Sequence, residues 1–125
     1  MIELQEVLIF HQKLIEEFGG SPGVRSVDLL EAALGRPYQT FDGQELYPSP
    51  EAKASAILES IVTNHPFIDG NKRIGYVLMR LILLGAGKDI EADEEEKYQF
   101  IIEVASGKRS FDSILEWIEL RIKDR

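Results

Sequence analysis

The residue types best suited to catalysis lie together in one short segment, HPFIDGNKR, at positions 65–73. Its histidine, His65, can take a proton from an attacking hydroxyl. Its carboxylate, Asp69, can hold a magnesium ion that bridges phosphates. Free backbone N–H groups at the start of the next expected helix, around Gly70 to Lys72, form an anion site, and the cationic side chains there add positive charge. Together these parts indicate transfer of a phosphoryl or nucleotidyl group from a magnesium-bound nucleotide.

Each of these residues, taken alone, also has a purely structural interpretation. A histidine at a helix end is more often structural than catalytic, Asp69-Gly70 is a common turn, and Asn71 is an ordinary N-cap. Lys72 and Arg73 alone are more often part of a solvated helix start, although the helix dipole disfavours cations there. This conflict with the dipole favours a bound anion. Phe67 is expected to be buried and to fix the loop to the core.

The apolar pattern predicts an all-α protein, a compact bundle of about six helices in a single domain over residues 1–125. The helices are expected at residues 3–18, 28–34, 49–65, 71–84, 93–105 and 110–122. The segment at 65–73 then joins the third helix to the fourth, so two core helices must position its side chains.

Residues 38–47 follow a different pattern and predict a β-hairpin. Asp42-Gly43 is a strong two-residue hairpin turn, because both central positions favour positive φ. The turn places these residues opposite one another: Phe41 and Gln44, Thr40 and Glu45, and Tyr38 and Tyr47. A lone two-stranded ribbon is only marginally stable, so we expect a mobile flap on a helical body.

Composition excludes several other kinds of chemistry. The chain has no cysteine and two histidines, which rules out disulfide scaffolds, zinc ribbons and thiol nucleophiles. Its net charge of −8 argues against a general surface for nucleic acid or anionic membrane. No signal peptide is apparent, and the most apolar stretch, Tyr76 to Gly87, is interrupted by Arg80 and is shorter than the ~20 residues of a spanning helix. A cytoplasmic protein that binds neither nucleic acid nor membrane is expected.

The string HPFIDGNKR resembles the signature of the Fic/Doc family, H-x-F-x-D/E-G/A-N-x-R. The upstream stretch FGGSPGVRSVDLLEAALGRP, the hairpin and the chain length resemble the Doc (death-on-curing) branch. The resemblance implies the family's helical fold, with ATP and Mg²⁺ as cofactors. It implies His65 as general base, Asp69 as magnesium ligand, and Gly70, Asn71, Lys72 and Arg73 as phosphate-binding residues. It also implies a flap that aligns the target by strand-like pairing, here Tyr38, Gln39, Thr40, Phe41, Gln44, Glu45, Leu46 and Tyr47.

Two departures bear on which group is transferred. Most Fic enzymes transfer AMP, with a small residue where this chain has Lys72 and a second arginine where it has Tyr76. Doc-like proteins have lysine at the first position, and there the reversed nucleotide gives its terminal phosphate to a hydroxyl of elongation factor Tu, which halts translation. Gly70 is instead similar to the AMP-transferring members. This difference amounts to one methyl group, which is smaller than the two departures at Lys72 and Tyr76. We therefore expect a kinase, with an AMP transferase and a non-catalytic binding module as the alternatives.

The resemblance also bears on regulation. Many Fic proteins inhibit themselves through a helix with S/T-x-x-x-E-G/N, and the nearest match here, Ser55 to Glu59, is interpreted as a coincidence. A separate antitoxin chain, similar to Phd, is therefore implied, which makes this protein the toxin of a toxin–antitoxin pair. Elsewhere, Arg80 is expected in a buried salt bridge, and Arg36 either reaches the nucleotide or caps the short helix. His11 and Trp117 are expected to be structural.

Overall fold

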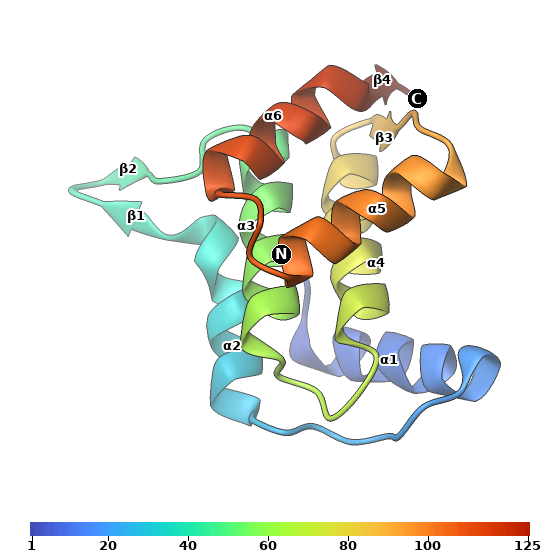
Figure 1. The fold of residues 1–125 in the computed structure, drawn as a ribbon. Coiled ribbons are helices and arrows are strands. Elements are labelled where there is room, and N and C mark those ends of the chain that lie inside the picture. Colours follow the sequence, from blue (N-terminus) through green and yellow to red (C-terminus); the bar gives the residue numbers. More distant parts are fainter.

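The computed structural model describes residues 1–125 and contains six α-helices and two small antiparallel sheets. The helices are α1 (Leu4–Phe18), α2 (Val27–Gly35), α3 (Pro50–Asn64), α4 (Asn71–Gly85), α5 (Glu94–Ala105) and α6 (Phe111–Arg121). A short 3₁₀ helix, η1, covers Arg36–Tyr38, and the strands are β1 (Thr40–Phe41), β2 (Gln44–Glu45), β3 (Lys88–Ile90) and β4 (Ile122–Asp124). The predicted all-α bundle is confirmed (Figure 1). None of its helices is both long and apolar enough to cross a membrane.

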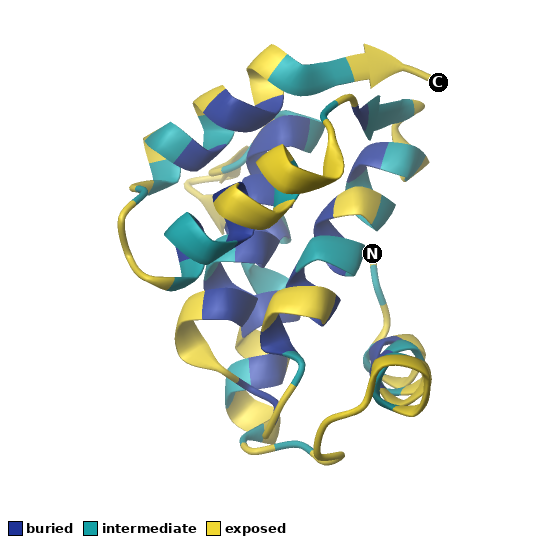
Figure 2. Cartoon of the chain, turned by 45° about the vertical axis from the view of Figure 1, so that its right-hand side comes forward, coloured by how far each residue is buried: buried dark blue, intermediate teal, exposed yellow.

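Helices α3 and α4 form the centre of the molecule, with the other elements around them (Figure 1). Most residues of α3 are buried, which identifies it as the core helix (Figure 2). Gly75 of α4 allows close packing, because a Cβ there would lie 2.8 Å from Cγ1 of Val62. Phe67 and Trp117 are 1% and 5% exposed, which confirms that both belong to the core.

Three helices begin where their capping residues predict. Ser49, Asp93 and Ser110 each accept a hydrogen bond from the backbone N–H three residues further on, at the starts of α3, α5 and α6. The predicted end of the last helix is wrong, because Ile122 has an extended backbone (φ −83°, ψ 151°) and begins β4.

A second sheet, formed by β3 and β4, was not predicted from the sequence. Gly87, at φ 76°, turns the chain out of α4. The two strands then pair antiparallel, with Lys88 opposite Asp124 and Ile90 opposite Ile122. This pairing fastens the end of α4 to the C-terminal segment of the chain.

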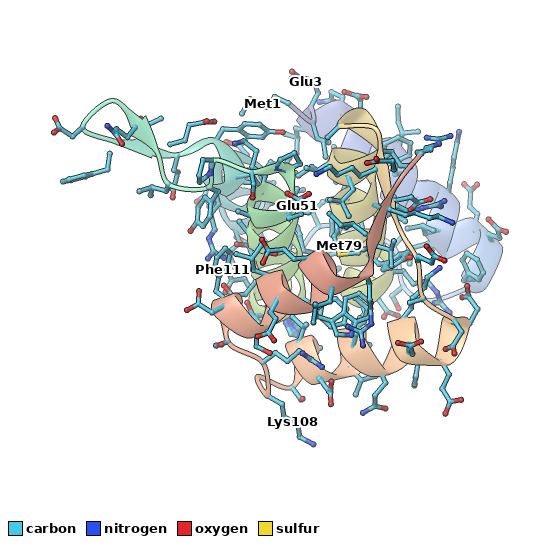
Figure 3. The ribbon with its side chains drawn as sticks, turned by 90° about the horizontal axis from the view of Figure 1, so that it is seen from above. Met1, Glu3, Glu51, Met79, Lys108 and Phe111 are labelled. Carbon is cyan, nitrogen blue, oxygen red and sulfur yellow. The ribbon has the colours of Figure 1, made fainter.

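The first sheet is the predicted hairpin, in a shorter form. Its turn, Asp42-Gly43, has positive φ at both residues, and the predicted pairs Thr40–Glu45 and Phe41–Gln44 are confirmed. The third pair, Tyr38 with Tyr47, is wrong, because Tyr38 belongs to η1. The hairpin projects from the helical body (Figures 1 and 3), and Phe41 near its tip is 76% exposed.

Two cations fasten the root of the hairpin to α3. Nζ of Lys53 lies 2.8 Å from Oε1 of Glu45 and also donates to the carbonyl oxygen of Tyr47. The Arg36 guanidinium donates to the Tyr47 hydroxyl and to Oε1 of Glu59, both at 2.9 Å. Of the two roles expected for Arg36, the cap is the one observed, since Arg36 is the C-cap residue of α2 while its side chain joins the hairpin to α3.

Candidate active site

A cavity of about 650 Å³ lies beside the loop that joins α3 to α4. The six residues expected to act on the nucleotide all line it: His65, Asp69, Gly70, Asn71, Lys72 and Arg73. Apolar and aromatic side chains of α1, α4 and α5 form much of the remaining lining, among them Phe18, Tyr76 and Tyr98. The cavity thus combines polar groups at the start of α4 with apolar and aromatic groups from the surrounding helices. This combination suits a nucleotide, which has charged phosphates and a flat base.

His65 stands at the end of α3 with its side chain exposed. It is the C-cap residue and adopts the left-handed conformation (φ 51°, ψ 61°), which turns the chain out of the helix. Its Nδ1 lies 3.2 Å from the carbonyl oxygen of Thr63. A carbonyl oxygen can only accept a hydrogen bond, so in the neutral ring Nδ1 carries the proton and Nε2 is free to accept one. A general base needs this tautomer.

Arg25, from the segment between α1 and α2, holds the backbone at His65. Its Nε donates to the carbonyl oxygen of His65 at 2.7 Å, and a second guanidinium nitrogen donates to that of Asn64. The last carbonyl groups of a helix have no partner within the helix. By binding two of them, Arg25 stabilises the end of α3 and also fixes the backbone of His65. Sequence analysis missed this residue, because nothing local signals a contact 40 positions away.

The same segment supports the rest of the loop through its backbone. Val24 and Phe67 form an antiparallel bridge, and the Ile68 N–H donates to the carbonyl oxygen of Gly23 at 3.1 Å. The carbonyl oxygen of Pro66 accepts two further backbone hydrogen bonds, one of them from Arg25 at 2.7 Å. The loop is therefore held in place by the protein itself, before any ligand binds.

Asp69 has an exposed carboxylate that is held by backbone N–H groups. Oδ2 accepts from Ser21 at 3.1 Å and Oδ1 from Gly70 at 2.8 Å. These hydrogen bonds, with a smaller contribution from the nearby cations, hold the pKa of Asp69 below its usual value, so the group stays ionised. Gly20 lies directly against it, since a Cβ there would be 2.8 Å from Oδ2. Gly20 and Ser21 are thus further residues of the site that sequence reasoning missed.

Asn71 uses its side chain inside the loop. Its Oδ1 accepts from the Phe67 N–H and its Nδ2 donates to the Phe67 carbonyl oxygen, both at 3.0 Å. The N-cap of α4 is Gly70 (φ 76°), so the interpretation of Asn71 as N-cap is wrong. The backbone N–H groups of Asn71, Lys72 and Arg73 have no hydrogen-bond partner in the structure, and they form the expected anion site.

The expected structural role of His11 is confirmed. His11 lies on α1 and packs against the loop that carries the site. Its ring is 3% exposed, stacks on Phe67 at 3.8 Å between ring centroids, and has Nε2 2.8 Å from the carbonyl oxygen of Asp69. Because that oxygen only accepts, Nε2 carries the proton and donates it. His11 therefore fixes the peptide between Asp69 and Gly70 from the side of α1.

Two exposed cations, Lys72 and Arg73, stand at the start of α4 without an acidic partner within 4.0 Å. The Arg73 guanidinium lies 4.7 Å from the centre of the Phe18 ring, a cation–π contact that orients it. Uncompensated cations at a helix start are unfavourable unless an anion joins them. Their arrangement suits a phosphate.

The donor set fits a magnesium ion that arrives with a nucleotide. No group of three or more acidic or histidine side chains is arranged so that it could hold a metal ion by itself. Mg²⁺ in nucleotide sites needs only one or two carboxylates together with the phosphates. Asp69, exposed and ionised beside the anion site, can supply that one carboxylate.

Other predicted residues lie away from this cavity. None of the hairpin residues lines it, although Tyr38 lines a separate cavity of about 390 Å³. Glu59 pairs with Arg36 and also lies outside the cavity, which agrees with the view that Ser55 to Glu59 is no inhibitory motif. Arg80 does form its predicted salt bridge, with Asp89, but its side chain is 49% exposed, so the expectation of a buried pair is wrong.

Comparisons with known proteins agree with this geometry. The sequence model of a family described as the Fic/DOC family matches residues 1–83. A protein named Toxin Doc from Mycolicibacterium smegmatis is 37% identical over 99 residues, which are 78% of this chain and 76% of that protein. A Fido domain-containing protein from Dictyostelium discoideum is 44% identical over 52 residues, 38% of this chain and 36% of its own.

Proposed function

The chain belongs to the Fic/DOC family, in its Doc branch, and from this premise we propose that it is a toxin kinase that transfers the terminal phosphate of ATP to a protein hydroxyl. One observation carries the proposal. The free Nε2 of His65 lines the same cavity as unpaired N–H groups and two unpaired cations at the start of α4. A base beside an anion site is what phosphate transfer to a hydroxyl requires.

In the proposed reaction, Nε2 of His65 takes the proton of the target hydroxyl as its oxygen attacks the terminal phosphorus. A new O–P bond forms, the bond to the bridging oxygen breaks, and ADP leaves. The N–H groups of Asn71, Lys72 and Arg73, with the two side-chain cations, bind phosphate oxygens and stabilise their charge. Magnesium, held by Asp69, supplies further neutralisation of the phosphates when it is bound.

Lys72 supports transfer of phosphate rather than of AMP. By resemblance, lysine at this position accompanies the reversed nucleotide, and here its side chain is exposed at the cavity and free of ion pairs. Gly70 is only weak evidence for AMP transfer. A Cβ at Gly70 would meet the ring of His11 and Ile15, both at 3.4 Å, so the missing methyl group faces α1.

The proposed partners are a separate antitoxin chain and elongation factor Tu as the protein substrate. The name of the relative Toxin Doc supports a role in a toxin–antitoxin pair. The engagement of Glu59 by Arg36 supports control from another chain, since this glutamate is already paired with a cation outside the cavity. The choice of elongation factor Tu rests on the resemblance.

Intact mass spectrometry of elongation factor Tu, after incubation with the chain and Mg–ATP, tests the proposal. We expect a gain of one phosphate, at least a hundredfold slower with His65→Ala because the base is lost. Asn64→Ala, an exposed neighbour that lines no part of the cavity, serves as the matched control and should transfer at the normal rate. A gain of one AMP would replace the kinase assignment by AMP transfer, and unreduced transfer by His65→Ala would refute the base.

A further inference from the structure

A third cation, Lys97 of α5, lines the same cavity as the start of α4. Its side chain is 23% exposed, so much of it packs against the protein. Its acidic neighbour is Glu94, at 3.5 Å between Nζ and Oε1, and the Glu94 side chain is itself 95% exposed. An exposed pair at that distance contributes little, so Lys97 is a partly buried cation with a weak partner.

Tyr76, which lies on α4, lines the same cavity and is a neighbour of Lys97. Burial alone would lower the pKa of Lys97, but the neighbouring Tyr76 and Glu94 raise it above its usual value, so the group stays charged. Tyr76 follows Arg73 by three residues, about 4.5 Å further along the axis of α4. Lys97 thus adds positive charge near Tyr76, on a part of the cavity lining that follows the start of α4.

No other acidic group forms an ion pair with Lys97. Asp89 interacts with Lys97 through charge, but both of its carboxylate oxygens are bonded to Arg80, at 3.0 Å and 2.9 Å. A cation that is only weakly paired keeps most of its capacity to bind an anion. An anion bound in the cavity can therefore pair with Lys97.

We propose that Lys97, with the hydroxyl of Tyr76, binds a second phosphate of the nucleotide, next to the phosphate held at the start of α4. This inference rests on the proposed function, since it requires a nucleotide in the cavity. The phosphates of a nucleotide are linked through single oxygens, so neighbouring phosphates need cationic groups that are themselves close together. Lys72 and Arg73 bind the first phosphate. Lys97 and Tyr76 then bind the next phosphate, further along α4.

Isothermal titration calorimetry with the non-hydrolysable analogue AMPPNP and magnesium tests this assignment. We expect Lys97→Met to weaken AMPPNP binding by roughly 10- to 100-fold, the range for a hydrogen bond to a charged group. Lys97→Arg, which keeps the charge, should retain most of the affinity. Lys108→Met is the matched control, because Lys108 is exposed in the turn between α5 and α6, outside the cavity (Figure 3).

Adenosine, which has no phosphate, separates a phosphate contact from a change in cavity shape. Its affinity should be the same for the native chain and for Lys97→Met. Equal losses for adenosine and AMPPNP, or equal AMPPNP affinities for Lys97→Met and Lys108→Met, would overturn the role of Lys97 and leave the kinase proposal standing. A native chain that binds no AMPPNP would overturn both. Circular dichroism of each variant establishes that it is folded.

Discussion

His65 and Asp69 reach their positions through residues that lie far from them in the sequence. Arg25 binds the carbonyl oxygen of His65, and Ser21 donates to the carboxylate of Asp69. From the other side, His11 donates to the Asp69 carbonyl oxygen. Positioning of this kind is worth as much to catalysis as the reacting groups themselves, because small displacements of a base or a charge reduce the rate steeply.

Gly20 offers a sharp test of this positioning. In Gly20→Ala, the new Cβ would lie 2.8 Å from Oδ2 of Asp69 and must displace the carboxylate. We expect kcat/KM for phosphate transfer to fall by about tenfold or more, equal to about 1.4 kcal/mol of transition-state stabilisation. The loss should be partly recovered at high magnesium concentration, because the ion's ligand is displaced but still present. Steady-state kinetics at several magnesium concentrations measures both effects.

Gly19→Ala is the matched control for Gly20→Ala. Both glycines have positive φ, 86° and 111°, so alanine strains the backbone by roughly 1 kcal/mol at either position. Only Gly20 touches Asp69, since a Cβ at Gly19 would have no neighbour within 4 Å. An equal loss of kcat/KM in the two variants would mean that strain in the segment, and not contact with the carboxylate, is responsible.

Among the elements, the hairpin is the one whose function depends most on how it is attached. Its strands have two residues each, and such a ribbon has little stability of its own. Lys53 and Arg36 therefore determine its direction through their contacts with Glu45 and Tyr47. The expectation that this hairpin aligns the protein target can be tested through these anchors without touching the cavity.

Lys53→Met should free the hairpin while the helices remain intact. We expect faster hydrogen exchange at the Leu46 amide, which donates to the Gln39 carbonyl oxygen at 3.0 Å, because the root of the ribbon is no longer held. If the hairpin aligns the target, KM for the protein substrate should rise several-fold while KM for ATP stays unchanged. Lys13→Met on exposed α1 is the control. An unchanged protein KM despite faster exchange would contradict the flap role.

The ion pair between Arg80 and Asp89 joins α4 to β3 and gives a pH signature. The Arg80 hydrogen bonds lower the pKa of Asp89 to about 2. A carboxylate whose folded pKa is depressed stabilises the fold fully above its unfolded pKa of about 3.9 and loses that contribution as pH falls. Between about pH 4 and pH 2, thermal stability should therefore fall more in the native chain than in Asp89→Asn.

Asp42→Asn is the control for that pH comparison. Asn-Gly forms the same hairpin turn as Asp-Gly, so this variant removes a carboxylate without disturbing the backbone. Its thermal stability should follow that of the native chain at each pH. Parallel curves for Asp89→Asn and the native chain would show that the pair contributes nothing to stability.

For the molecule as a whole, stability depends on the contact between α3 and α4. Gly75→Ala places a Cβ 2.8 Å from Cγ1 of Val62, and such overpacking should cost about 1–3 kcal/mol in free energy of unfolding. Gly85→Ala, in the last turn of α4, meets nothing within 4 Å and should be neutral or stabilising by up to about 1 kcal/mol. Urea denaturation distinguishes the two, and equal stabilities would mean that the core accommodates the methyl group.

The helices could be predicted because their signals are local. Capping side chains such as Ser49 and Asp93 mark helix starts to within one residue, and Asp42-Gly43 fixes the hairpin register next to the turn. The hairpin's predicted length was wrong for a local reason as well. Pro37 fixes φ and has no N–H to pair, so the chain at Tyr38 forms a 3₁₀ turn instead of a strand.

What the sequence could not predict depends on contacts between distant residues. Strands β3 and β4 have three residues each, too short to show an alternating pattern. In the sequence they are separated by two helices, α5 and α6, so no local signal indicates that they pair. The site followed the same rule. The motif residues could be expected to lie together from their adjacency, and they do line one cavity, whereas Arg25 and Gly20 became visible only when the fold brought them to the loop.

Because residues 20–26 support the loop, the motif alone is not enough to identify related chains that can form this site. Under the proposed function, we expect a chain that keeps HPFIDGNKR unchanged to be inert if an insertion displaces Val24 and Arg25. For the same reason, we expect no activity from the motif grafted alone onto another helical hairpin. The site therefore requires two segments of the chain, the motif and residues 20–26. A comparison of sequences by the motif alone would include chains in which the site does not form.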